Sequence, residues 1–198
     1  MILFTPVFET EKREPIRVPK YEGVKMGLEV FLNYKFEEFN FKYEWNNGVL
    51  EAEEKVKDSE RYIIDNICRK FAKTKYYENG DSILPEADVH LKELGKYRRP
   101  DAVYFQKDQI RKQKSFQTPP LFIIEIISPS NSSIEVEKKT KEYFQAGIKV
   151  VWHIYPSLKE VKIYYSAKQV RICNEDDVCD VGNILSDFNL SISDIFKE

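Results

Sequence analysis

The chain has 198 residues, of which 42% are apolar, 14% aromatic and 32% charged, a composition that fits one globular domain with a substantial core. Its 31 basic and 33 acidic side chains nearly cancel to a net charge of −2. This balance excludes a strong overall positive field that would attract nucleic acid, so any contact with nucleic acid needs a local basic patch. No stretch approaches the about 18 apolar residues of a membrane span, and three cysteines without a CxxC pair favour reduced thiols in a cytoplasmic protein.

The pattern of apolar and turn-forming residues predicts an N-terminal arm over residues 1–26, which carry three prolines, and one domain over residues 27–198. Within the domain we expect a helix, a β-hairpin and a second helix first, at 27–39, 41–53 and 58–75. Three strands, a helix, two further strands and a docked tail should follow, at 86–91, 101–106, 121–128, 128–147, 150–156, 161–167 and 184–196. This order predicts an α/β fold with a mixed central sheet flanked by helices.

Local signals support several of these elements. Asn47 and Gly48 tolerate the positive φ of a tight hairpin turn. Ser132 with Glu135 fits a capping box at the start of the long helix, and Gly147 fits its end.

One glutamate stands inside the most apolar predicted strand. Glu125 has apolar residues on both sides in a run typical of a strand covered on both faces. An ionised carboxylate there costs several kcal/mol unless a positive group meets it. Asp101 follows Pro100 at the entrance of the preceding strand, where we expect its side chain to reach water. Two carboxylates on neighbouring strands can converge on one divalent cation, and Mg²⁺ typically takes one or two of them.

A lysine on the following helix is the candidate partner of this glutamate. Lys139 lies three residues after Val136 and four before Tyr143, so it shares the edge of their inward face. Lys138 and Lys141 should point towards solvent. The alternative is a structural ion pair, with Asp101 an ordinary strand cap, because such networks also surround buried carboxylates.

Five segments in this order resemble the Uma2 family of endonucleases: YEWNNGVLEAE, RRPDAVYF, PPLFIIEIISPSN, KTKEYFQAGIKVVWHIYP and VKIYY. That family belongs to the PD-(D/E)XK restriction-endonuclease-like superfamily, and the resemblance runs from about Gly27 to the end of the chain. It implies a restriction-endonuclease-like mixed central β-sheet flanked by helices. It also implies a metal-dependent endonuclease that hydrolyses DNA phosphodiester bonds with Mg²⁺ or Mn²⁺.

The resemblance also implies roles for individual residues. Asp101 and Glu125 match the catalytic acids that bind the metal. The superfamily pattern has a lysine where this chain has Ile127, and the basic role then moves to Lys139. Glu44 matches an early acidic residue that could complete the metal shell; the alternative is an exposed strand glutamate paired with Lys42 or a neighbour.

Candidate contacts to substrate phosphates are Arg98, Arg99 and Lys112, each of which could equally be a solvated side chain. We expect DNA as the partner, with RNA left open, and a homodimer. The rival hypothesis is a catalytically silent nucleic-acid-binding or dimerisation module with the same fold. His90 and His153 each stand alone in a strand, which favours structural histidines over metal ligands.

Overall fold

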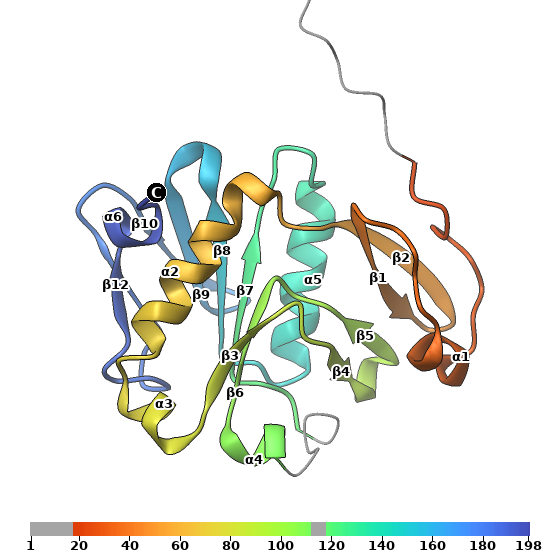
Figure 1. The fold of residues 1–198 in the computed structure, drawn as a ribbon, viewed down its shortest axis with the longest axis horizontal. Coiled ribbons are helices and arrows are strands. Elements are labelled where there is room, and N and C mark those ends of the chain that lie inside the picture. Colours follow the sequence, from red (N-terminus) through yellow and green to blue (C-terminus); the bar gives the residue numbers. More distant parts are fainter. Residues whose placement is uncertain (1–17, 112–117) are drawn as a thin grey trace, which may run out of the picture.

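The structure, a computed structural model, describes residues 18–111 and 118–198 (Figure 1). Most of the predicted N-terminal arm, and Lys112, lie outside these residues. The helices are α1 Leu28–Asn33, α2 Arg61–Phe71, α3 Lys75–Asn79, α4 Lys107–Arg111, α5 Ser133–Gln145 and α6 Ile192–Ile195. The strands are β1 Phe41–Asn46, β2 Val49–Glu54, β3 Ser82–Pro85, β4 Val89–Leu91, β5 Lys96–Arg98, β6 Ala102–Phe105, β7 Phe122–Ile126, β8 Val150–Tyr155, β9 Glu160–Ser166, β10 Gln169–Cys173, β11 Val178–Asp180 and β12 Asn189–Ser191.

Two sheets carry most of these strands. The large sheet has the order β10-β9-β8-β7-β6-β3, and the small sheet has the order β2-β1-β5-β4. The pair β7 and β8 is parallel and all other neighbours in the large sheet are antiparallel. A parallel pair needs a crossover connection, and α5 supplies it. The predicted mixed sheet flanked by helices is confirmed.

Alternating side chains of the large sheet build a core on each face. On one face, Ile124 and Trp152 pack with α2, through Ile67, and with the C-terminal segment, through Phe188 and Ile195. The predicted docked tail is therefore confirmed. On the other face, residues such as Ile123 and Val151 pack with Tyr143 of α5. Glu125 and His153 have the same strand parity as Ile123 and Val151, so they face α5.

Several local expectations change in the structure. The first helix ends at Asn33 instead of 39, because Tyr34 turns to extended backbone and Phe36 packs on Tyr43 of the hairpin. Helix α5 has Ser132 as its N-cap, but the expected capping-box bond is absent, since the serine side chain makes no cap hydrogen bond. Gly147 has a φ of +102°, as the predicted stop requires. Short strands β3, β5 and β10 to β12 had no predicted counterpart.

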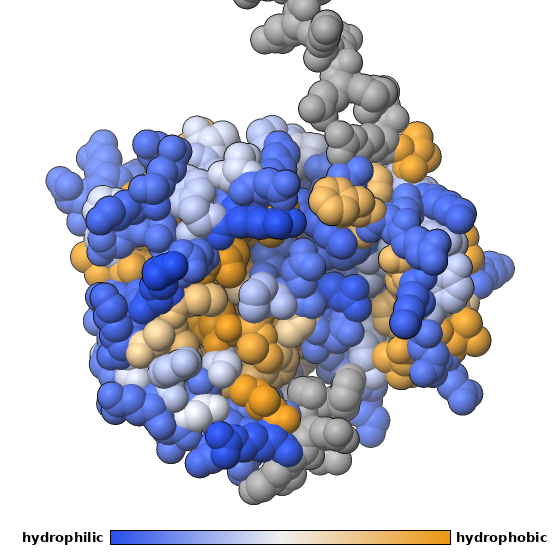
Figure 2. All heavy atoms as spheres, in the orientation of Figure 1, coloured by the Kyte–Doolittle hydropathy of each residue, from blue (hydrophilic) through white to orange (hydrophobic). Residues whose placement is uncertain are grey.

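The surface in the view of Figure 2 is mostly hydrophilic, with apolar residues gathered near α1 and between α2 and β3. Exposed apolar side chains of the α1 segment include Val30 and Leu32. No helix within residues 18–111 and 118–198 is both long and apolar enough to cross a lipid bilayer.

Candidate active site

The candidate site lies where the small sheet meets the large sheet and α5. Residues 99–101 connect β5 of the small sheet directly to β6 of the large one. Helix α5 lies between the large sheet and the β1–β2 hairpin (Figure 1). Side chains from the hairpin, the strand connection, β7 and α5 can therefore meet in one place.

The hairpin contributes a charged face to this junction. Its register pairs Lys42 with Glu53 and Glu44 with Glu51, and these four side chains share one face because strand residues alternate. Tyr43 points the other way, into an aromatic cluster with Phe36 and Tyr21. The hairpin is thus held by aromatic packing on one face and presents charges to the site on the other.

Lys42 contacts Asp101. Its Nζ atom lies 2.6 Å from Oδ1 of Asp101 and 3.3 Å from Oε2 of Glu53. The other oxygen of Asp101 accepts a 2.7 Å hydrogen bond from the backbone N–H of Ile126. Asp101 is only 5% exposed, so its side chain has much less access to water than expected; the lysine and the β7 backbone contact its two oxygens instead.

Glu125 meets the lysine that the helical pattern indicated. Its Oε1 atom lies 3.3 Å from Nζ of Lys139 and accepts a 2.5 Å hydrogen bond from the hydroxyl of Tyr143. Its Oε2 atom accepts a long hydrogen bond, 3.4 Å, from the backbone N–H of Asp101. The two candidate metal-binding acids are therefore neighbours, and Lys139 lies in the same site. Lys138 and Lys141 are exposed, as expected.

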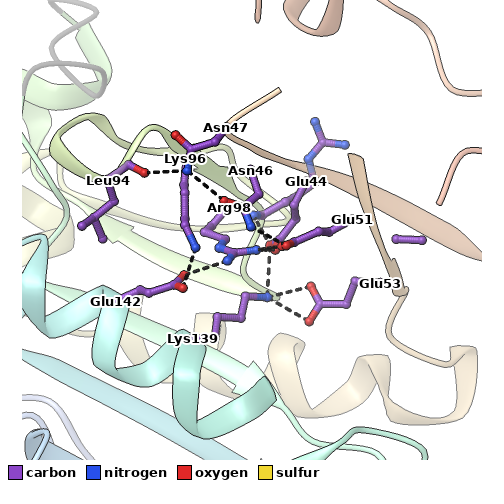
Figure 3. Close-up of polar contacts among 12 residues, drawn as sticks. Glu44, Asn46, Asn47, Glu51, Glu53, Leu94, Lys96, Arg98, Lys139 and Glu142 are labelled. Atoms are coloured by element: carbon purple, nitrogen blue, oxygen red, sulfur yellow. Dashed lines mark hydrogen bonds and ion pairs between the residues drawn. The ribbon is translucent and has the colours of Figure 1, made fainter. Parts of the chain in front are cut away.

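Lys139 contacts two further carboxylates from the hairpin (Figure 3). Its Nζ atom lies 3.0 Å from Oε1 of Glu44 and 2.8 Å from each oxygen of Glu53. Glu44 is buried, so the expected alternative of an exposed glutamate is wrong in that respect, but Glu44 does pair with neighbouring cations, Lys139 and Arg98. We define the charged site as these six side chains: Lys42, Glu44, Glu53, Asp101, Glu125 and Lys139.

Arg98 supports the charged site from outside. Its guanidinium donates to Glu44 at 2.8 Å, to Glu142 at 2.7 Å and to Glu51 (Figure 3). Lys96 completes this outer group with a 2.6 Å contact to Glu142. Arg98 is buried among carboxylates, so its guanidinium is not presented to a phosphate, which corrects the expected role in nucleic-acid contact.

Burial and charge shift the acidities of the site. Burial raises the pKa of Asp101 despite the nearby Lys42, and it also raises the pKa of Glu53. Burial acts in the same direction on Glu44, but Lys139 and Arg98 outweigh it and lower the pKa of Glu44 to about 2. Burial opposes the charge of Lys139, yet Glu125, Glu44 and Glu53 raise its pKa well above the ordinary value. Lys139 is therefore a stable cation in this arrangement.

The donor set fits a hard divalent cation. The charged site holds four carboxylates and two ammonium groups, a formal charge of −2. Mg²⁺ and Mn²⁺ prefer such oxygen ligands and would offset this excess. Within residues 18–111 and 118–198, no three acidic, histidine or cysteine side chains are already gathered as a metal-binding group, because ammonium groups stand between the carboxylates.

A groove leads to the charged site from the α2 side of the molecule. Asp101 lies in its wall together with residues of α2, of the connection before it, and of the end of β3 and the residue that follows: Val56, Arg61, Ile64, Asp65, Cys68, Pro85 and Glu86. Arg99, the other arginine expected to contact phosphate, is partly exposed and pairs with Asp88 at 2.8 Å. Lys112 lies outside the described residues.

His153 lies beside the site without joining its ion pairs. It is 1% exposed and its Nε2 atom lies 3.0 Å from the hydroxyl of Thr140. That hydroxyl donates to the carbonyl of Val136 at 2.7 Å, so Nε2 of His153 is the donor and Nδ1 carries no proton. Burial, and then the charges of Lys139 and Lys162, lower the pKa of His153 to about 3. The expectation of a structural histidine is consistent with this placement.

The family model for Uma2, described as "Putative restriction endonuclease", matches residues 28–193. The chain belongs to the Uma2 family. Its membership supports a nuclease at the family level and agrees with the resemblance drawn from the sequence. The fold is similar to a crystal structure described as a "putative nuclease belonging to DUF820" from Anabaena variabilis ATCC 29413, with a TM-score of 0.70 and 21% identity over 84% of this chain and 94% of that one. No curated protein matches the chain.

Sequence reasoning missed part of the charged site of this Uma2 protein. Lys42 and Glu53 were not among the predicted site residues, and Tyr143 was predicted only as an apolar inward residue. Strand alternation places Lys42 on the same face as Glu44, and the hairpin turn places Glu53 opposite Lys42. That alternation is the signal that could have identified both.

Proposed function

We propose that this member of the Uma2 family is a divalent-metal-dependent endonuclease that hydrolyses phosphodiester bonds in DNA. The observation that carries the proposal is the convergence of Asp101, Glu125 and Lys139, with the backbone N–H of Asp101 3.4 Å from Glu125 and Nζ of Lys139 3.3 Å from the same carboxylate. Two acids and a cation in one buried site are the groups that such a hydrolysis requires.

Each residue has a distinct task in this proposal. Asp101 and Glu125 would hold Mg²⁺ or Mn²⁺, and Glu44 would complete the negative surroundings of the ion. When bound, such an ion lowers the pKa of a water molecule and offsets the charge that develops on the scissile phosphate. Lys139 adds a fixed positive charge for that phosphate. Tyr143 orients the Glu125 carboxylate through its 2.5 Å hydrogen bond.

The outer residues support the site in other ways. Arg98 fixes Glu44 and Glu142, which ties the hairpin to α5. Arg99, which lies in the connection between β5 and β6 and is partly exposed, stays a candidate for contacts to substrate phosphates, and so does Lys112 on the sequence alone.

The test is a cleavage assay with purified protein, Mg²⁺ or Mn²⁺, and four substrates: supercoiled DNA, linear duplex, single-stranded DNA and RNA. We expect the wild-type protein to cleave DNA, and we expect this cleavage to stop in excess EDTA and to be lost in Asp101→Ala. Because the variant is purified in the same way, cleavage in its preparation would reveal a contaminating nuclease. Cleavage that continues in EDTA would contradict the proposed metal dependence. Binding of DNA without cleavage of any substrate would favour the catalytically silent module.

A further inference from the structure

Glu53 is placed differently from the other acids of the charged site. Its oxygens lie 2.8 Å from Nζ of Lys139, and Oε2 also lies 3.3 Å from Nζ of Lys42, so one carboxylate bridges both lysines. Its side chain is 25% exposed, against 14% for Lys139 and 1% for Lys42. Glu53 is therefore the anion on the solvent side of the two ammonium groups. Figure 3 shows its carboxylate facing the ammonium group of Lys139.

A phosphate would make the same contacts as this carboxylate. Both are compact anions with two oxygens available to ammonium donors, and lysine binds either as a point charge. Asp101 and Glu125 lie deeper, with side chains only 6% exposed. An incoming phosphodiester would therefore meet Glu53 before it met the lysines, and the two like charges would repel each other.

We propose that in the free protein Glu53 occupies the position at which a substrate phosphate binds Lys42 and Lys139, and that the phosphate displaces it. The inference rests on the proposed function, because the phosphate is that of the nucleic-acid substrate. Glu53 is then an internal competitor of the substrate, and it keeps the two lysines neutralised until nucleic acid arrives.

Displacement of Glu53 leaves no buried cation without a partner. Lys42 keeps Asp101 at 2.6 Å, and Lys139 keeps Glu44 at 3.0 Å and Glu125 at 3.3 Å. Glu53 also lies near the end of β2, an edge strand of the small sheet. Its side chain can therefore turn towards solvent without breaking the core of the hairpin.

The experiment measures binding of a fluorescein-labelled single strand, and of its duplex, by fluorescence anisotropy in EDTA, so that metal-dependent cleavage does not interfere. The variants are Glu53→Gln and, as a matched control, Glu51→Gln. Both substitutions lie on the same face of β2 and remove one negative charge, but Glu51 contacts Arg98 instead of the two lysines. We expect Glu53→Gln to tighten binding about tenfold, equivalent to about 1.4 kcal/mol, and Glu51→Gln to change it far less.

Equal tightening by both variants would overturn the inference, because it would reflect net charge alone. Unchanged or weaker nucleic-acid binding by Glu53→Gln would also overturn the inference. If a separate titration showed that this variant also binds Mg²⁺ more weakly than the wild type, Glu53 would be a metal ligand instead. Melting temperatures verify that each variant is folded, and Glu53→Ala gives a second test in which no amide replaces the carboxylate. Wild-type cleavage in Mg²⁺ is measured separately: tightening by Glu53→Gln without any cleavage would sink the proposed nuclease and leave this phosphate position standing.

Discussion

The hydroxyl of Tyr143 on α5 donates a 2.5 Å hydrogen bond to Oε1 of Glu125 on β7. Both side chains are buried, and the same oxygen faces Lys139 at 3.3 Å. The crossover helix therefore fixes the orientation of the carboxylate with one neutral donor and one cation. The roles of these groups can be separated by substitution.

Tyr143→Phe should weaken both the fold and cleavage. A hydrogen bond to a charged group contributes about 1.5–3 kcal/mol, and its loss leaves Glu125 with Lys139 and the long bond from Asp101. We expect the free energy of unfolding, measured by urea denaturation, to fall by about 2 kcal/mol, and we expect cleavage in Mg²⁺ to be slower. Tyr164→Phe is the control, since its bond to Glu137 is exposed. Equal effects of the two substitutions would contradict the role of Tyr143.

Lys139→Met should abolish cleavage, because the methionine keeps the apolar stem and removes the charge beside Glu125. Three carboxylates lose a partner, and breaking a buried ion pair costs about 3–5 kcal/mol of stability. Cleavage must therefore be measured well below the melting temperature of the variant. Lys138→Met, on the exposed side of α5, should cleave and melt like the wild type. Retained cleavage in folded Lys139→Met would leave the chemistry to the two acids alone.

Mg²⁺ should stabilise the wild-type protein against heat, because an ion that binds only the folded state shifts the unfolding equilibrium. At a concentration 100 times the dissociation constant, the gain is about 2.7 kcal/mol. Asp101→Asn should lose this gain, whereas Asp65→Asn, at an exposed position on α2, should keep it. Differential scanning calorimetry with and without Mg²⁺ measures both. An equal gain in Asp101→Asn would place the ion elsewhere.

Stability should fall as the pH drops below 6.5, in part because of His153. Its pKa is about 3 in the folded protein, against an ordinary value of 6.5, so the unfolded chain binds the proton first as the pH falls. The contribution of the neutral histidine to the free energy of unfolding is complete above pH 6.5 and is lost progressively between about pH 6.5 and pH 3. At pH 5 about 2 kcal/mol of it has been lost. In His153→Gln, which can still donate to Thr140, the free energy of unfolding should fall by about 2 kcal/mol less between pH 7 and pH 5 than in the wild type. An identical drop in both proteins would show that His153 titrates normally.

The homodimer stays a prediction. Exposed apolar side chains around α1 are compatible with an interface, but sedimentation at micromolar concentration is needed to decide. A monomer there would dispose of the dimer.

Much of the fold was predictable because long apolar elements dominate it. The periodic residues of α2 and the apolar run of β7 are signals that tertiary contacts reinforce. The short strands β5, β11 and β12 have three residues each, too few to show alternation. The first helix was predicted too long because its aromatic residues serve the hairpin cluster instead of a helical face.

The candidate site was predictable only in part, for a physical reason. Lys139 followed from helical phase, since one helix fixes which of its residues point inward. Arg98 has no such local signal: its burial among three glutamates depends on how the small sheet packs against α5. The contacts of Lys42 with Asp101 depend in the same way on two sheets meeting.

The parts of the charged site are made at very different times during synthesis. Lys42 and its partner Asp101 are 59 residues apart, and Glu53 and Lys139 are 86 residues apart. Chains emerge from the ribosome with their N-terminal segments first, so the hairpin acids exist long before the helix that carries Lys139. A chain that stops before α5 also lacks β8, the parallel neighbour of the strand that holds Glu125. Whatever chemistry this site performs, a polypeptide that has not yet reached α5, or that terminates before it, lacks Lys139 and cannot perform it in this way.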